Sequence, residues 1–179
     1  ADDFSIRWIG WLKPPVAGRY RFRLLADDAA QLWIDGKPLF CDMRGFTTIS
    51  ERMMPEDIVQ SLNSYFDIMV DVIMEHHGGI VDKYLGDCTM ALFGAPARHD
   101  DDALRAVRTA FEMLERLPPF NAEQQKKKRP PFRIGIGITY GVVTVGNIGS
   151  DKKMDYTVIG DKVNLASRLQ DLTKVYREP

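Results

Sequence analysis

The sequence at residues 82–94 reads DKYLGDCTMALFG and predicts two short strands joined by a tight turn. The pair Gly86-Asp87 interrupts the apolar pattern and is typical of a two-residue hairpin loop. Asp87 would then lie beside a buried strand. A carboxylate is rarely placed there without a positive charge to meet it.

A second aspartate has the same setting earlier in the chain. Asp42 follows the apolar run Leu39-Phe40-Cys41 and opens into a turn at Gly45. Two such carboxylates are consistent with a pair of hard divalent cations held by oxygen ligands, as Mg²⁺ requires when it also binds phosphates. From spacing alone, two aspartates that cap turns explain the pattern equally well.

A third motif, at residues 155–169, reads DYTVIGDKVNLASRL and predicts a strand, a glycine turn and a helix. Asn164 and Arg168 are four residues apart, so they would share one face of that helix. An amide and a guanidinium group on one face suit a phosphate or a transition-state oxygen.

Between these motifs the sequence predicts two long helices. The first begins at Pro55 and ends at Gly78-Gly79. The second begins with the acidic residues 100–102 and ends at Leu117, because Pro118-Pro119 should stop it.

Two further strands, at residues 132–139 and 142–146, are expected to pair around a turn at Tyr140-Gly141. From residue 39 on, the expected order is therefore βαββαβ, followed by another helix. That order is the ferredoxin-like arrangement, an α+β fold with an antiparallel sheet and helices on one face. The last helix is expected to turn these side chains inward: Val163, Ala166, Leu169 and Leu172.

With the three motifs in this order, residues 39–179 resemble the catalytic domain of the class III nucleotidyl cyclases, the adenylyl and guanylyl cyclases. The resemblance implies that ATP is converted to 3′,5′-cyclic AMP and pyrophosphate in a head-to-tail homodimer. It also implies two divalent ions in each site, Mg²⁺ or Mn²⁺. Their ligands would be Asp42, Asp87 and the carbonyl oxygen of Met43.

The resemblance assigns roles to further residues of the three motifs. The backbone amides of Gly45-Phe46-Thr47 would receive terminal phosphate oxygens. Asn164 and Arg168 match the residues that orient the ribose and stabilise the pentavalent phosphorus. Together with Lys83, they would act on ATP held by the partner subunit's aspartates, so each homodimer would hold two composite sites.

Lys83 and Thr157 fall on the two positions with which the family selects its base. A donor at Lys83 can reach adenine N1, which is an acceptor, whereas guanine N1 is a donor. Guanylyl cyclases usually place Glu at the position of Lys83. The Lys-Thr pair resembles an adenylyl cyclase subclass whose members are often stimulated by bicarbonate. The alternatives are a guanylyl cyclase and a catalytically weak domain that only dimerises or binds nucleotide.

The chain departs from the family's pattern in two places. It stops at Pro179, before a lysine that the family uses to grip the triphosphate. The domain is therefore expected to be truncated at its C-terminus and to lack its final strands. Gly135 stands where some members have an arginine.

Residues 1–38 differ from the rest and resemble the opening part of a PA14 domain, an antiparallel β module that often binds sugars outside the cell. Short alternating strands are expected in this segment. Asp27-Asp28 matches a dipeptide that ligates Ca²⁺ in some members, although we favour a polar turn there. The segment is interpreted as a fused or truncated all-β fragment, with sugar binding as an alternative function.

The composition limits the partners. A net charge of −1 provides no field that would recruit nucleic acid or a membrane surface. The sequence has no run of about 18 apolar residues that could span a bilayer, and no signal peptide opens it. Cys41 and Cys88 are interpreted as reduced, which fits a cytoplasmic domain of a protein that could itself be membrane-anchored.

Overall fold

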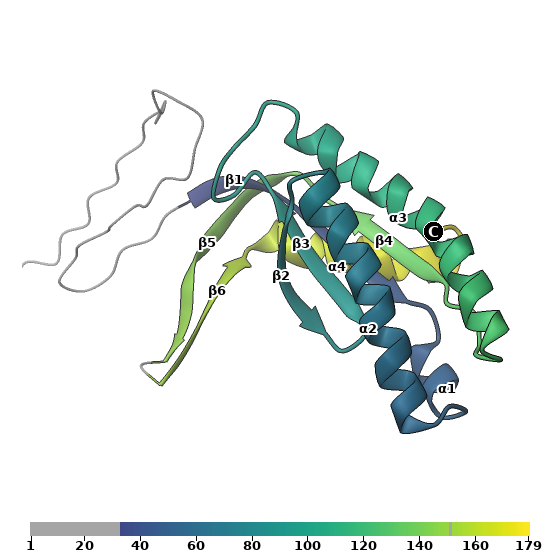
Figure 1. Ribbon diagram of the computed structural model, residues 1–179. Helices are drawn as coiled ribbons and strands as arrows, with labels where there is room; N and C mark the ends of the chain where they lie inside the picture. The colour runs from purple at the N-terminus through teal and green to yellow at the C-terminus, as the bar shows by residue number, and fades with distance from the viewer. Residues whose placement is uncertain (1–32, 151) are drawn as a thin grey trace, which may run out of the picture.

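The computed structural model of the chain describes residues 33–150 and 152–179. The hypothesis of a PA14-like β fragment with Asp27-Asp28 therefore falls almost entirely outside the described residues. The chain combines helices with one antiparallel sheet in an α+β arrangement (Figure 1). The elements are β1 (Trp33–Met43), α1 (Phe46–Ser50), α2 (Pro55–Asp71), η1 (Val72–His76), β2 (Ile80–Leu85), β3 (Cys88–Phe93), α3 (Asp102–Lys126), β4 (Ile134–Ile138), β5 (Gly141–Ser150), β6 (Lys153–Ile159) and α4 (Asp161–Tyr176).

The sheet is antiparallel throughout, with β1 at its centre. Strand β3 pairs with one side of β1, and β2 pairs with β3. Strand β4 pairs with β1 as well, so these four strands have the order β2-β3-β1-β4. The predicted ferredoxin-like core is confirmed in this order.

Strands β4 and β5 run in line along β1, and the predicted hairpin at Tyr140-Gly141 is wrong. Ile138 pairs with Leu39, and Gly141, three residues later, pairs with Gly36, three residues earlier. The register against β1 therefore continues unbroken from β4 into β5. The true hairpin joins β5 to β6, and these two strands project as an arm beyond the helices (Figure 1).

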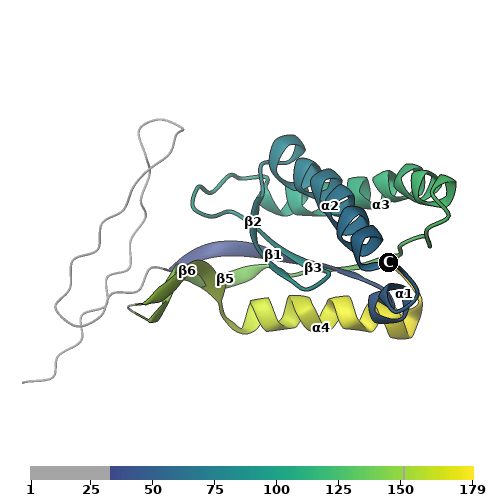
Figure 2. The same ribbon diagram turned by 60° about the horizontal axis from the view of Figure 1, so that its bottom comes forward.

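Helices cover both faces of the sheet. Figure 2 shows α2 and α3 on one face, as predicted for the core, and α4 on the other. Side chains of β1 alternate between two buried clusters, as the period of a strand requires. Leu39, Cys41 and Met43 pack with α2 and α3, whereas Phe40 packs with Val163 and Ala166 of α4.

Helix α4 packs directly on the backbone of β4. A Cβ atom on Gly137 would lie 2.2 Å from the carbonyl oxygen of Ala166 and 2.4 Å from the amide nitrogen of Gln170. Only glycine permits this approach. Val163 and Ala166 face the sheet as predicted, and Gln170 is buried beside them. The prediction for Leu169 and Leu172 is wrong, since both are exposed.

Helix α3 continues through Pro118-Pro119 to Lys126, so the predicted end at Leu117 is also wrong. Prolines inside a helix cost about 3 kcal/mol or more, because they remove hydrogen bonds and clash with the preceding turn. Here the helix face formed by Leu117, Phe120 and Gln124 is buried on both sides of the prolines. Tertiary packing therefore outweighs the local preference.

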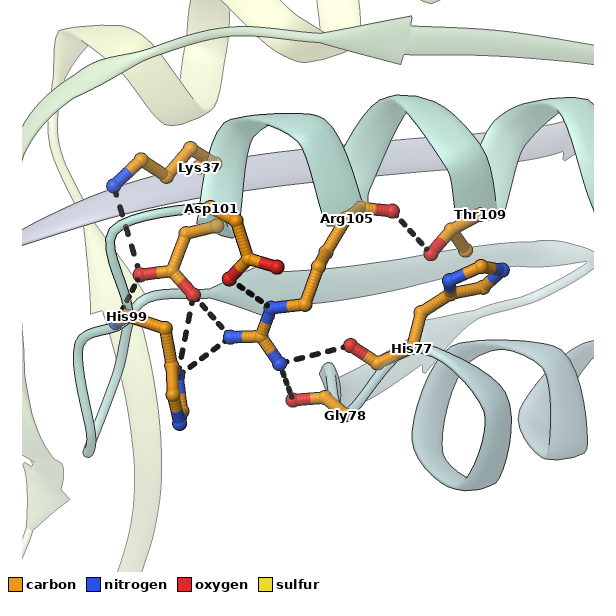
Figure 3. A network of polar contacts seen from close by, with 8 residues as sticks. Lys37, His77, Gly78, His99, Asp101, Arg105 and Thr109 are labelled. Atoms are coloured by element: carbon orange, nitrogen blue, oxygen red, sulfur yellow. Dashed lines mark hydrogen bonds and ion pairs between the residues drawn. The ribbon is translucent and has the colours of Figure 1, made fainter. Parts of the chain in front are cut away.

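A buried ion-pair network ties the start of α3 to the sheet (Figure 3). The carboxylate of Asp102 is fully buried and lies 3.8 Å from Nζ of Lys37 on β1. It accepts a hydrogen bond from the backbone N–H of His99 and contacts the Arg105 guanidinium. Arg105 in turn donates to the carbonyl oxygen of His77 at 2.9 Å. The network fixes α3 against β1 and the turn before β2.

Among residues 33–150 and 152–179, no helix has the length and apolar character needed to cross a membrane.

The close packing of α4 on β4 predicts different effects for two glycine substitutions. Gly137→Ala should lower the free energy of unfolding by about 2 kcal/mol, because the added methyl group meets backbone atoms that cannot move aside. Gly146→Ala is the control, since a Cβ there meets nothing within 4 Å. It should change stability by less than about 0.5 kcal/mol in urea unfolding. Equal effects of the two would contradict this packing.

Candidate active site

Asp42 and Asp87 meet at one end of the sheet. Cys41 of β1 pairs with Thr89 of β3, so the residue after Cys41 lies beside the start of the hairpin strand. Gly86, with φ 67°, and Asp87 form the loop between Leu85 and Cys88. The backbone N–H groups of Asp87 itself and of Met43 both act to lower the pKa of the Asp87 carboxyl group, so they lie near it. The predicted neighbours Asp42, Met43 and Asp87 are therefore brought together.

The two carboxylates repel each other in a partly buried place. Burial raises the pKa of Asp87, its own backbone N–H opposes that rise, and the negative charge of Asp42 raises it further. Burial, with the charges of Asp42 and Asp87, also raises the pKa of the Cys88 thiol to about 12. The pKa of Cys41 is raised to about 12 by its full burial. Both cysteines are free, neutral thiols near neutral pH, so the negative charge at this place comes from the two carboxylates and not from sulfur.

Helix α4 supplies a cation to this pair. Nζ of Lys174 lies 3.2 Å from Oδ2 of Asp42 and 3.0 Å from Oδ1 of Asp171. The hydrogen bond to Asp171 and the contact with Asp42 raise the pKa of Lys174. Nε2 of Gln170 donates to the same oxygen of Asp42 at 3.3 Å. Sequence reasoning missed Gln170 and Lys174, although they follow Ala166 at intervals of four residues and so share its helix face.

The oxygen donors at this site fit a divalent cation whose coordination shell is completed by water or by a bound ligand. Two carboxylates and the adjoining Met43 carbonyl are oxygen donors, and the pair already attracts an ammonium group. Within the described part of the chain, no group of three or more His, Cys, Asp and Glu side chains could hold a metal ion. A metal held by Asp42 and Asp87 would therefore take its other ligands from water or phosphate oxygens, as Mg²⁺ commonly does.

The turn after β1 carries the predicted phosphate-binding backbone. Gly45 has φ 67° and is exposed, and α1 begins at Phe46 directly after it. The Phe46 ring anchors this turn by an edge contact with Phe132, with 6.2 Å between ring centroids. Thr47 is exposed. The backbone N–H groups of a first helical turn have no partner within the helix, so they are free for other acceptors.

Lys83 and Thr157 are brought together through a residue that sequence reasoning missed. Oδ2 of Asp82 accepts a hydrogen bond from Oγ1 of Thr157 at 2.8 Å and lies 3.6 Å from Nζ of Lys83. Asp82 and Lys83 belong to β2, and Thr157 belongs to β6. Its position directly before Lys83 was the only signal for Asp82 in the sequence.

Asn164 and Arg168 are not brought to the aspartates of their own chain. Both are exposed on α4, whereas the face toward the sheet carries Val163, Ala166 and Gln170. Neither side chain makes a hydrogen bond or ion pair with any residue in the described ranges. They therefore take no part in the contacts that hold the described part of the chain together.

Comparison with protein families gives two matches. The model described as the adenylate and guanylate cyclase catalytic domain matches residues 38–176. The PA14 domain model matches residues 1–53, so the two matches overlap from residue 38 to residue 53. In the described structure, residues 38–43 lie in β1 and residues 46–50 form α1.

Curated relatives include two adenylate cyclases. The adenylate cyclase of Anabaena cylindrica is 44% identical over 142 residues, which cover 77% of this chain and 27% of that protein. Adenylate cyclase 1 of Rhizobium meliloti is 40% identical over 138 residues, which cover 77% of this chain and 21% of that protein. The chain thus spans about a quarter of the length of these relatives.

Solved structures of both cyclase types resemble the chain. The guanylyl cyclase Cya2 has a TM-score of 0.76 and 44% identity, covering 80% of this chain and 72% of that one. The adenylyl cyclase CyaB from P. aeruginosa also has a TM-score of 0.76, with 36% identity, covering 80% and 74%. The similarity alone therefore leaves the base open.

Charge repulsion between the aspartates predicts that Asp87→Asn stabilises the chain when no divalent cation is present. Asn avoids both the burial of a charged carboxylate and the repulsion from Asp42, so the melting temperature in EDTA should rise, by no more than about 3 °C because solvent screens much of the effect at this partly exposed site. Asp155→Asn, at an exposed position of β6, should leave it unchanged. A lower melting temperature for Asp87→Asn would show that the aspartates do not repel.

Proposed function

The chain belongs to the adenylate and guanylate cyclase catalytic domain family, and we propose that it converts ATP to 3′,5′-cyclic AMP and pyrophosphate. The observation that carries the proposal is the paired carboxylates Asp42 and Asp87 beside an exposed glycine turn. In the reaction, the ribose 3′-oxygen forms a bond to the α-phosphorus. The bond from that phosphorus to the bridging oxygen breaks, pyrophosphate leaves, and the hydroxyl proton is released.

Asp42, Asp87 and the Met43 carbonyl would hold Mg²⁺ or Mn²⁺, which when bound would neutralise the triphosphate and lower the pKa of the 3′-hydroxyl group. Lys174 would then leave Asp42 and keep its contact with Asp171. The backbone N–H groups of Gly45-Phe46-Thr47 would bind the terminal phosphate oxygens. This arrangement aligns the leaving group with the attacking oxygen.

We propose that the remaining catalytic groups, Asn164 and Arg168, act from a second copy of the chain. Both are exposed on α4 and have no partner among the described residues. A stripe of exposed apolar side chains accompanies them on the helix: Leu165, Leu169, Leu172, Val175 and Tyr176. Burial of such a stripe would favour a dimer. In a head-to-tail homodimer each α4 would bring its amide and guanidinium groups to the partner's aspartates.

Adenine is the base that the side chains favour. The Lys83 ammonium group is a hydrogen-bond donor only, so it suits adenine N1 and not the N1–H group of guanine. The 44% identity with a guanylyl cyclase supports GTP as the second candidate substrate. Because ATP is an intracellular nucleotide, we propose that the domain works in the cytoplasm.

Loss of either aspartate tests the reaction directly. Asp42→Asn and Asp87→Asn should each lower kcat for cyclic AMP formation by about 100-fold or more, because each removes an anionic ligand. Asp155→Asn should keep full activity. Asp42→Asn and Asp87→Asn should also lose the rise in melting temperature that Mn²⁺ gives the unchanged protein. Near-normal turnover in either variant would contradict the assignment.

Substrate choice should depend on Lys83 and Thr157, which we call the base-reading pair. The unchanged protein should form cyclic AMP faster than cyclic GMP at equal concentrations of ATP and GTP. Lys83→Glu combined with Thr157→Cys should shift the ratio of kcat/KM values toward GTP, because Glu accepts from guanine N1–H. A preference for GTP in the unchanged protein would favour the guanylyl cyclase alternative.

Mixing two inactive variants tests the composite site. Asp42→Ala and Asn164→Ala should each inactivate both sites of their own homodimer. In a mixed dimer, one site carries both changes and the other carries none. Random exchange should therefore restore about a quarter of the normal activity. No recovery, when light scattering and labelled subunits show that exchange has occurred, would contradict a shared site.

A further inference from the structure

We propose that Asp82 is a positioning residue that sets which purine the site accepts, by forcing the Thr157 hydroxyl group to act as a hydrogen-bond acceptor toward the base. The inference rests on the proposed function and deepens it. It concerns a residue outside the base-reading pair itself, because Asp82 would touch Lys83 and Thr157 and not the nucleotide.

The contact between Asp82 and Thr157 is a buried side-chain hydrogen bond. The Asp82 side chain is 7% exposed, and Thr157 is also 7% exposed. Oγ1 of Thr157 lies 2.8 Å from Oδ2 of Asp82, which is an ordinary hydrogen-bond length for a hydroxyl group. Strands β2 and β6 lie at opposite ends of the paired order, yet they contact each other here. Asp82 therefore joins two edges of the sheet.

A β-bulge places Asp82 between the base-reading residues. Val81 pairs with Ala91, but Lys83 pairs with Met90, so Asp82 is an extra residue in β2. In a regular strand, residues 81 and 83 would share one face. Here Val81 packs with the cluster under α2 and α3, whereas Met90, opposite Lys83, belongs to the cluster under α4. The bulge thus turns Lys83 toward the face that carries Asp42.

The carboxylate decides how Thr157 can bond. A threonine hydroxyl has one hydrogen to donate and two lone pairs, so alone it could bind either purine. An ionised carboxylate only accepts, so Thr157 must donate its single hydrogen to Asp82. Only lone pairs then remain on Oγ1. Adenine presents a 6-amino donor at this edge, whereas guanine presents the O6 acceptor. The threonine would therefore bind adenine and repel guanine.

The same carboxylate oxygen of Asp82 also attracts the ammonium group of Lys83, the other residue expected to contact the base. Nζ of Lys83 lies 3.6 Å from Oδ2 of Asp82, and the lysine side chain remains 34% exposed, so its other hydrogens can reach a base. Asp82 would hold a donor for N1 and an acceptor for the 6-amino group at one fixed spacing. A purely structural role would instead make Asp82 a link between β2 and β6 with no effect on base choice.

The test compares ATP with GTP in Asp82→Asn. An amide can donate to Oγ1, which frees the Thr157 hydrogen for guanine O6, so the preference for ATP should fall by about tenfold or more. Preference is measured as the ratio of kcat/KM values and, independently of turnover, by displacement of a fluorescent ATP analogue. Asp155→Asn, two residues before Thr157 and exposed, is the matched control and should leave both ratios unchanged.

A double-mutant cycle separates base reading from structure. In a Thr157→Val background, Asp82→Asn should no longer alter the preference, because no hydroxyl group remains to be oriented. If the amide variant fails to fold, Asp82→Ser, which is smaller and neutral, carries the same expectation. The proposal is overturned if Asp82→Asn lowers kcat/KM and affinity equally for ATP and GTP. It is also overturned if Asp82→Asn changes the ATP-to-GTP ratio as much in the Thr157→Val background as in the unchanged protein. Absence of any turnover by the unchanged protein would contradict the proposed function, while the displacement ratios still decide the role of Asp82.

Discussion

The antiparallel pairing of β1 with β3 is the constraint from which the site follows. That register places the residue after Cys41 beside the β2–β3 loop, and so holds Asp42 and Asp87 together at one end of the sheet. Two carboxylates in a partly buried place need a compensating positive charge. Helix α4 provides it through Lys174, and it can approach because β4 has glycine where a side chain would meet the helix backbone.

The central part of this arrangement could be predicted from the sequence. Gly86-Asp87 identified the hairpin, and the apolar run before Asp42 identified the strand that pairs with it. Local patterns were sufficient there because a two-residue loop fixes the register of its strands. Longer-range features were not predictable in this way. Pro118-Pro119 lie inside α3 because packing outweighs propensity, and β4 and β5 run in line because both pair with β1.

The contacts that complete the site depend on tertiary structure. Lys174 reaches Asp42 only because α4 crosses the sheet at the glycines of β4. Asp82 meets Thr157 because a bulge in β2 and the approach of two sheet edges bring residues 75 positions apart within hydrogen-bond distance. No sequence pattern encodes either contact. Asn164 and Arg168 illustrate the reverse case, since their shared helix face was predicted but neither side chain has a partner among the described residues.

The position of a bound divalent ion tests the central claim most directly. Crystals grown with Mn²⁺ and a non-reactive ATP analogue would locate the ion by its anomalous scattering. We expect a peak in contact with the carboxylates of both Asp42 and Asp87, with Nζ of Lys174 moved away from Asp42. An anomalous peak away from these two carboxylates would contradict the account. So would a structure in which Asp42 still pairs with Lys174 while nucleotide is bound.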